Sequence, residues 1–194
     1  MSAIEVRSAT HDELPRAVDA LLLAFGADPF TRWIFPDAHD YVVGFSAVLR
    51  ESAARAAENG SAYVTSDFGG AALWLPPGVQ PNEQALASVF LELVRGQHLS
   101  DFMAVYEKMN GFHPDEAHWY LPMIGVDPTR QGGGLGSALL HRALARIDDD
   151  GLLAYLESSN PANISLYERH GFEVIGEIRV SDLSLVTPML RKPR

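Results

Sequence analysis

The sequence predicts a mixed α/β (α+β) fold in which a mostly antiparallel central sheet contains one parallel strand pair and is flanked by helices. The first observation is a pair of short apolar segments, residues 62–65 and 71–75, joined by a glycine-containing turn as in a β-hairpin. The second is a strand–helix–strand unit, in which apolar runs at 120–126 and 153–158 enclose an amphipathic segment. Such a crossover is right-handed and places its two strands parallel.

Helix signals dominate the chain before the hairpin. Thr10 and Glu13 form a capping-box pattern ahead of an amphipathic segment that extends to Phe25. Asp28 and Pro29 are typical of an N-cap and a first helical residue. The elements predicted around these signals are a strand at 4–7, the helix that ends near Phe25, a short helix ended by Pro36 and a helix from Tyr41 to Asn59.

Between the hairpin and the next strand, the sequence predicts two helices. The run Pro76–Gly78 ends the sheet, and apolar residues then recur at helical spacing over 86–93 and again over 102–109. We therefore expect residues 1–194 to form a single domain with a helical insertion at about 80–116.

The C-terminal part is expected to return to the sheet. Asn160 and Pro161 are typical of a helix start, and the short helix that they begin would end at Gly171. Residues 172–180 and 187–190 alternate between apolar and polar side chains, which predicts a final antiparallel strand pair.

Composition argues against several classes of protein. The chain has 194 residues, 47% of them apolar, and a formal net charge of −10. An acidic chain binds nucleic acid poorly, the first residues have no secretory pattern, and no apolar stretch is long enough to span a bilayer. We therefore expect a soluble, cytoplasmic protein with no nucleic-acid or membrane partner. Cysteine is absent, which excludes disulfides, thiolate metal ligands and an acyl-cysteine intermediate.

A glycine-rich loop precedes the helix of the crossover. Arg130 and Gln131 are followed by Gly-Gly-Gly-Leu-Gly. Glycines at a helix start allow close approach of the backbone to a ligand, and the first-turn amides have no partner within the helix. With the helix dipole behind them, these amides suit a phosphate or pyrophosphate. The backbone would do most of the holding, because only Arg130 adds a formal charge.

Spacing separates three kinds of phosphate-binding loop. The nucleotide P-loop requires a lysine and then Ser or Thr after its last glycine, whereas Ser137 follows Gly136 directly. The dinucleotide pattern G-x-G-x-x-G lacks its last glycine when it is started from Gly132 or from Gly134. The pattern that fits is Q-x-x-G-x-G, which begins at Gln131.

This loop resembles the acetyl-coenzyme A pyrophosphate loop of the GNAT superfamily of N-acetyltransferases. A second segment, from Tyr155 through Tyr167 to Gly171 and Phe172, is similar to the one that closes the cofactor site in that superfamily. Among the members of this superfamily, the puromycin N-acetyltransferases are those that residues 116–194 resemble most. The first half of the chain shows little likeness, so the resemblance does not imply an acceptor.

The resemblance implies a GNAT-like fold whose parallel strands splay apart, and acetyl-coenzyme A as the cofactor. Backbone groups near residues 123–126 would then bind pantetheine as an added strand does, and Pro122 fits such an irregular strand because it has no N–H to lose. An amide around Ile124 or Gly125 would stabilise the oxyanion. The expected cofactor-binding residues are Ile124, Gly125, Val126, Gln131, Gly132, Gly133, Gly134, Leu135, Gly136, Ser137, Asn163 and Tyr167.

Direct acetylation of an alkylamine requires one general base and one general acid. The resemblance assigns the acid to Tyr167, which would protonate the departing sulfur, and the alternative is a tyrosine with a packing role. Glu157 is the first choice for the base, followed by Glu116 and His118, each acting directly or through water. A solvated glutamate and a structural histidine stay open as alternatives, and Asn163 could either contact the cofactor or cap a helix.

We therefore expect an acetyl-coenzyme A-dependent N-acetyltransferase that acts on a small amine, as a monomer or homodimer. Two alternatives stay open: a non-catalytic acyl-coenzyme A sensor, and an enzyme that acetylates protein lysines or N-termini. The helical insertion favours small acceptors, because it would wall off a pocket. No metal is expected, since His113 and His118 flank a proline-containing segment and are not aligned on a helix.

Overall fold

The computed structural model of the protein describes residues 4–180 and 185–194. Residues 1–3, on which the expected lack of a secretory signal partly rests, lie outside the described residues. The helices are α1 Leu14–Ala24, α2 Pro29–Ile34, α3 Ala38–Asp40, α4 Ser46–Glu58, α5 Glu83–Leu93, α6 Gln97–Asn110, α7 Leu135–Asp149 and α8 Ile164–Arg169. The strands are β1 Val6–Ser8, β2 Ala62–Thr65, β3 Gly70–Leu75, β4 His118–Val126, β5 Leu153–Ser158, β6 Glu173–Val174, β7 Ile178–Arg179 and β8 Leu185–Arg191.

Strand pairing confirms the predicted fold class. The strands form a sheet in the order β1-β2-β3-β4-β5-β8-β6, and β7 also pairs with β8. Among the described strands, β4 and β5 are the parallel pair and the other neighbours are antiparallel. The parallel strands are the two that the crossover through α7 joins, as the sequence predicts.

The two parallel strands separate before β4 ends. Their pairing stops where Leu121 lies opposite Leu156, although β4 continues to Val126. On its other side β4 contains a bulge, because the partners of Leu73 and Leu75 are three residues apart in β4, at Met123 and Tyr120. Pro122 lies within this bulge, which confirms the expectation that the proline marks an irregular strand.

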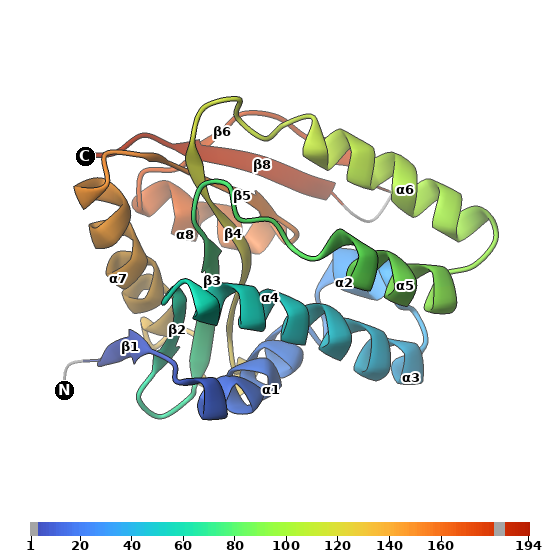
Figure 1. The fold of residues 1–194 in the computed structure, drawn as a ribbon, viewed down its shortest axis with the longest axis horizontal. Helices are drawn as coiled ribbons and strands as arrows, with labels where there is room; N and C mark the ends of the chain where they lie inside the picture. The colour runs from blue at the N-terminus through green and yellow to red at the C-terminus, as the bar shows by residue number, and fades with distance from the viewer. Residues whose placement is uncertain (1–3, 181–184) are drawn as a thin grey trace.

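Helices cover both faces of the sheet. Successive residues of β3 point to opposite faces, so that Leu73 and Leu75 join the core formed with α1 and α4, whereas Ala72 and Trp74 join the core formed with α7 and α8. Figure 1 shows α7 to the left of β2 and β3, whereas α4 crosses in front of these strands and extends to their right. The parallel pair therefore lies in the middle layer, with helices on either side.

The two helices predicted between the hairpin and β4 are present as α5 and α6, which lie with α2 at the end of the molecule away from α7 (Figure 1). Asn82 caps α5 by accepting a hydrogen bond from the amide of Ala85 at 3.1 Å. Phe90 of α5 stacks on Phe35 with ring centroids 6.0 Å apart and contacts Phe102 of α6 at 4.4 Å. Among the described residues, no helix combines the length and apolar character needed to cross a membrane.

The predicted strand over 172–180 is wrong as a continuous element. It is divided into β6 and β7, both paired with β8; the amide of Ile175 still donates to the carbonyl of Pro188 in β8, and Gly176 and Glu177 separate the two strands. Gly176 lies in this break, directly against the ring of Phe112, where a Cβ atom would have no room. The break thus follows from packing against a residue far away in the sequence, which alternation within the segment cannot reveal.

The predicted helix from Tyr41 to Asn59 also differs at its start. The chain forms the short helix α3, then a π-helical turn at Tyr41–Phe45, and only then α4. Gly44 lies in this turn against side chains of Phe35 and Leu93. A π-helical turn adds one residue to the helix and shifts the faces of the residues that follow. The apolar spacing does not reveal this added residue, and it therefore predicts one regular helix.

Candidate active site

The glycine loop has the backbone geometry of an anion-binding helix start. Gly132 and Gly134 have φ angles of +76° and +86°, in the left-handed region that favours glycine. Gly134 is the N-cap residue of α7, and no side chain among the described residues caps the first turn of that helix. The first amides of α7 are therefore available to a ligand.

Arg130 is paired within the loop region. Its Nη2 atom lies 2.6 Å from Oδ2 of Asp67, and Oδ1 of that aspartate accepts hydrogen bonds from the amide of Gly69 and the hydroxyl of Thr65. The hydrogen bond from Arg130, helped by these two donors, holds the pKa of Asp67 well below its usual range. Because Asp67 neutralises the guanidinium of Arg130, an anion at this loop would interact mainly with the backbone amides.

A cavity of about 770 Å³ extends from this loop, past the splayed strands, to the wall formed by α2, α5 and α6. All the cofactor-site residues predicted from the sequence line it, with the exception of Gly133. The residues thus brought together are Ile124, Gly125, Val126, Gln131, Gly132, Gly134, Leu135, Gly136, Ser137, Asn163 and Tyr167. Of the predicted catalytic residues, Tyr167 and Glu157 line the cavity as well.

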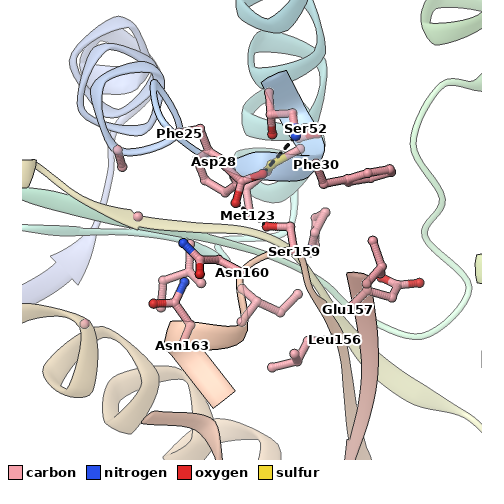
Figure 2. A pocket seen from close by; sticks show the side chains of 18 of the residues that line it. Phe25, Asp28, Phe30, Ser52, Met123, Leu156, Glu157, Ser159, Asn160 and Asn163 are labelled. Atoms are coloured by element: carbon pink, nitrogen blue, oxygen red, sulfur yellow. Dashed lines mark hydrogen bonds between the residues drawn. The ribbon is translucent and has the colours of Figure 1, made fainter. Parts of the chain in front are cut away.

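Two amide side chains lie at the end of the cavity near the glycine loop. Gln131 donates a hydrogen bond to the carbonyl of Val126 at 3.4 Å and so folds the loop back onto the end of β4. The side chain of Asn163 makes no cap hydrogen bond to α8, and Asn160 provides the cap of the preceding turn by accepting from the amide of Ala162 at 3.0 Å. Figure 2 shows Asn160 and Asn163 on the same side of the cavity.

Tyr167 projects from α8 into the cavity and is only 5% exposed. Its ring packs edge-on against Phe172, with centroids 6.1 Å apart. Burial raises the pKa of Tyr167, and the nearby Asp28 carboxylate raises it further. The phenol is therefore protonated at neutral pH, as a hydrogen-bond donor or general acid must be.

Glu157 is a buried carboxylate, with a side chain only 4% exposed. It lies on the same face of β5 as Tyr155, whose hydroxyl donates to Oε1 at 3.0 Å. Nε2 of His113 lies 3.4 Å from the same oxygen. Burial, followed by the charge of Glu157, raises the pKa of both Tyr155 and Tyr120, so these phenols stay protonated beside the carboxylate. The alternative of a merely solvated glutamate is wrong.

Asp28 is a second buried carboxylate in the cavity, 7% exposed. Its Oδ1 atom accepts from the amide of Thr31 at 2.9 Å, which confirms the predicted cap. Its Oδ2 atom accepts from the hydroxyl of Ser159 at 2.7 Å, and Figure 2 shows the two side chains meeting beside the cavity. No sequence pattern predicts the contact with Ser159. An aspartate before a proline is already explained by its role as a helix cap, so nothing in the sequence points to a second partner.

Glu116 and His118, the other candidates for the base, lie outside the large cavity. They line a second cavity of about 350 Å³, and His113 and Tyr120 belong to the linings of both cavities. Nδ1 of His118 lies 2.8 Å from the carbonyl of Glu116, and its Nε2 lies 3.2 Å from Nδ1 of His113. His118 therefore reaches Glu157 only through His113, which sequence reasoning considered solely as a metal ligand.

Comparisons with known proteins agree with this arrangement. The model of the acetyltransferase (GNAT) family matches residues 72–172, which include β4, the glycine loop and α8. The mycothiol acetyltransferase of Salinispora tropica is 48% identical over 54 residues, 26% of this chain and 18% of that protein. An uncharacterized N-acetyltransferase of Schizosaccharomyces pombe is 30% identical over 118 residues, 55% of this chain and 48% of that protein. The matches thus span less than half the length of these relatives.

Solved structures show the same fold over the whole chain. A Corynebacterium glutamicum structure described as histone acetyltransferase HPA2 and related acetyltransferase is 29% identical, with a TM-score of 0.73 over 100% of this chain and 98% of that one. An agmatine N-acetyltransferase structure has a TM-score of 0.66 at 19% identity, covering 98% of this chain and 100% of that one. The likeness specific to puromycin N-acetyltransferases is not shown by these comparisons. The matched family model, together with the splayed strands and the glycine loop, establishes that the chain belongs to the acetyltransferase (GNAT) family.

Proposed function

We propose that the protein transfers an acetyl group from acetyl-coenzyme A directly to the amine of a small molecule. The observation that supports this most strongly is one continuous cavity lined by the glycine loop, Tyr167 and Glu157. An anion-binding helix start, a protonated phenol and a buried carboxylate are the groups that amine acetylation from a thioester needs.

The cofactor end of the cavity fits coenzyme A. The amides that begin α7 would hold the pyrophosphate, and the left-handed glycines before them leave room for it. The edge of β4 that β5 leaves uncovered would bind the pantetheine amides as a further strand. An amide at Ile124 or Gly125 would polarise the thioester carbonyl.

The other end of the cavity suits a compact cationic acceptor with an apolar body. Its wall is largely aromatic, with Phe30, Phe35, Phe90, Phe102 and Tyr106. Asp28 and Glu157 place two buried carboxylates in the same space, which favours an ammonium over an anion. Because α5 and α6 form one side of the cavity, a small molecule fits better than a lysine on a folded protein.

Glu157 and Tyr167 divide the proton transfers between them. Glu157 accepts a proton from the acceptor ammonium, so that the nitrogen lone pair can attack the thioester carbon. Tyr167 donates a hydrogen bond to the sulfur and gives up its proton as the bond to carbon breaks. The non-catalytic sensor is the remaining alternative, and both of these groups would be dispensable in it.

Replacing Glu157 with glutamine tests this assignment. We expect wild-type protein to release thiol from acetyl-coenzyme A with at least one member of a panel of alkylamines, arylalkylamines, diamines and puromycin. In Glu157→Gln, kcat at neutral pH should fall by roughly a hundredfold, because an amide cannot take up the proton. The deficit should shrink as pH rises, since more of the amine is then already deprotonated.

The matched control is Glu58→Gln, which alters an exposed glutamate of α4 with a side chain 62% exposed. It should leave kcat unchanged. Acetyl-coenzyme A binding without thiol release, for every amine in the panel, would contradict the proposed function and support the sensor. Equal activity of the two glutamine variants would contradict only the role of Glu157 and would leave the proposed function standing.

Transfer should proceed through a ternary complex. The chain has no cysteine to accept the acetyl group. Ser137 has a histidine partner, since its hydroxyl lies 2.7 Å from Nε2 of His170, but it belongs to the first turn of α7 at the pyrophosphate end of the cavity. We expect lines that intersect in initial-rate plots with both substrates varied. Parallel lines, or an acetylated protein trapped in the absence of acceptor, would contradict a direct transfer.

A further inference from the structure

The carboxylate of Glu157 is connected to a second cavity by a chain of two imidazoles. His113 lies between the two cavities, with Nε2 at 3.4 Å from Oε1 of Glu157 and Nδ1 at 3.2 Å from Nε2 of His118. His118 is half-buried and lines only the second cavity, of about 350 Å³. The chain of side chains therefore runs from the interior of one cavity to the lining of the other.

The hydrogen-bond partners fix where the protons are. The carbonyl of Glu116 can only accept, so Nδ1 of His118 is protonated and, in a neutral ring, its Nε2 must accept. Nδ1 of His113 is then the donor to His118. This leaves Nε2 of His113 facing Oε1 of Glu157. The lone pair of Nε2 and the carboxylate oxygen would repel each other, so one proton must lie between them, on either the imidazole or the carboxyl group.

Amine acetylation needs a route of this kind. An alkylammonium loses two protons on becoming an amide, whereas the departing thiolate takes up one, so one proton per turnover has to leave the site. With both substrates bound, the large cavity is filled, and the Glu157 side chain is already only 4% exposed without them. A proton on Glu157 then has no open path to water through the acceptor end.

We propose that His113 and His118 form a proton exit path from Glu157 to the second cavity, an inference that rests on the proposed function. Glu157 takes one proton from the ammonium, and the proton that it shares with His113 moves fully onto Nε2 of His113. Nδ1 of His113 releases its proton to Nε2 of His118, and His118, now doubly protonated, loses one proton to water in the second cavity. Both rings line that cavity, so exchange with its water returns them to their starting tautomers before the next turnover. The other proton of the ammonium replaces the one that Tyr167 gives to the sulfur, so that all protons are accounted for.

The groups around the two imidazoles suit this direction of transfer. Tyr120 on β4 and Tyr155 on β5 pack against His113, with ring centroids 4.7 Å and 4.4 Å away, and Tyr106 on α6 lines the same cavity. Burial raises the pKa of all three phenols, so they donate hydrogen bonds and do not take up the proton. The acidic residues Asp115 and Glu116 line the second cavity, into which the proton is released.

Nitrogen NMR tests the hydrogen-bond chain without reference to activity. At about pH 8 we expect neutral His118 to be in the Nδ1–H tautomer, because its Nδ1 donates to the carbonyl of Glu116. An Nε2–H tautomer at His118 would overturn the proposal, because the ring could then not accept a proton from His113.

A kinetic experiment tests the transfer itself. In His113→Gln we expect kcat to fall about tenfold at neutral pH, with KM for both substrates within about twofold, because an amide can fill the space but cannot pass on a proton. The deficit should shrink toward about pH 10, where an alkylamine is bound without its extra proton. Imidazole buffer should restore part of the turnover, whereas a non-protolytic salt at equal ionic strength should not.

The matched control is His98→Gln. His98 is another partly buried histidine, whose Nε2 lies 2.6 Å from the carbonyl of Trp33, and it lines neither cavity. The control should show no pH-dependent deficit and no effect of imidazole. If His113→Gln behaves like His98→Gln while wild-type protein acetylates amines, the proton path is overturned and the proposed function survives. If wild-type protein acetylates none of the amines, the proposed function fails and the path fails with it.

Discussion

Gly134→Val is expected to abolish the binding of acetyl-coenzyme A. Gly134 has a φ angle of +86° at the start of α7, a conformation that a β-branched residue avoids. To relieve the strain, the backbone would rotate and turn the first amides of the helix away from the cavity, where the valine side chain would also occupy the approach of the pyrophosphate. Isothermal titration calorimetry should detect no heat of binding.

The strain itself requires a control, because a left-handed valine costs roughly 1–3 kcal/mol of stability wherever it stands. Gly151 offers a matched position just beyond the other end of α7, with a φ angle of +67° and open space where a Cβ atom would lie. Gly151→Val should lower the melting temperature by a comparable amount and retain cofactor affinity. Unchanged affinity in Gly134→Val, or equal loss of affinity in both variants, would contradict the cofactor assignment of the loop.

Tyr167→Phe is expected to slow acetyl transfer by roughly ten- to a thousandfold. The loss is partial because a thiolate with a pKa near 8.5 departs to some extent without a proton donor. The raised pKa of Tyr167 also makes the phenol a weak acid, so that much of its effect would come from a hydrogen bond to the sulfur. Turnover should fall in stopped-flow or steady-state assays, while KM for acetyl-coenzyme A and the melting temperature stay close to wild type.

Tyr63→Phe is the matched control, because Tyr63 is a buried tyrosine of β2 that lines neither cavity. It removes a phenol hydroxyl from the interior without touching the proposed site, and its turnover should be that of the wild type. Normal turnover in Tyr167→Phe would return this residue to a packing role. A fall in activity that matches a fall in stability would lead to the same conclusion.

The sequence determined most of the elements and the glycine loop, because their signals are local. The spacing of Thr10 and Glu13 predicts the capping box that the structure contains. The order of strand, glycines and helix predicts a loop whose left-handed residues are Gly132 and Gly134. Pro122 indicates an irregular strand, and the bulge lies there. In each case the residues that set the geometry are within a few positions of one another.

Only the tertiary structure decided which side chains meet at the end of the cavity away from the glycine loop. Asp28 meets Ser159 across a sequence separation of 131 residues, and Glu157 meets His113 because the end of the helical insertion returns to β5. The same kind of distant contact, between Phe112 and Gly176, interrupts the predicted C-terminal strand. Periodicity and capping report on hydrogen bonds within a few residues, whereas these contacts depend on how the sheet and its helices pack, which no local pattern specifies.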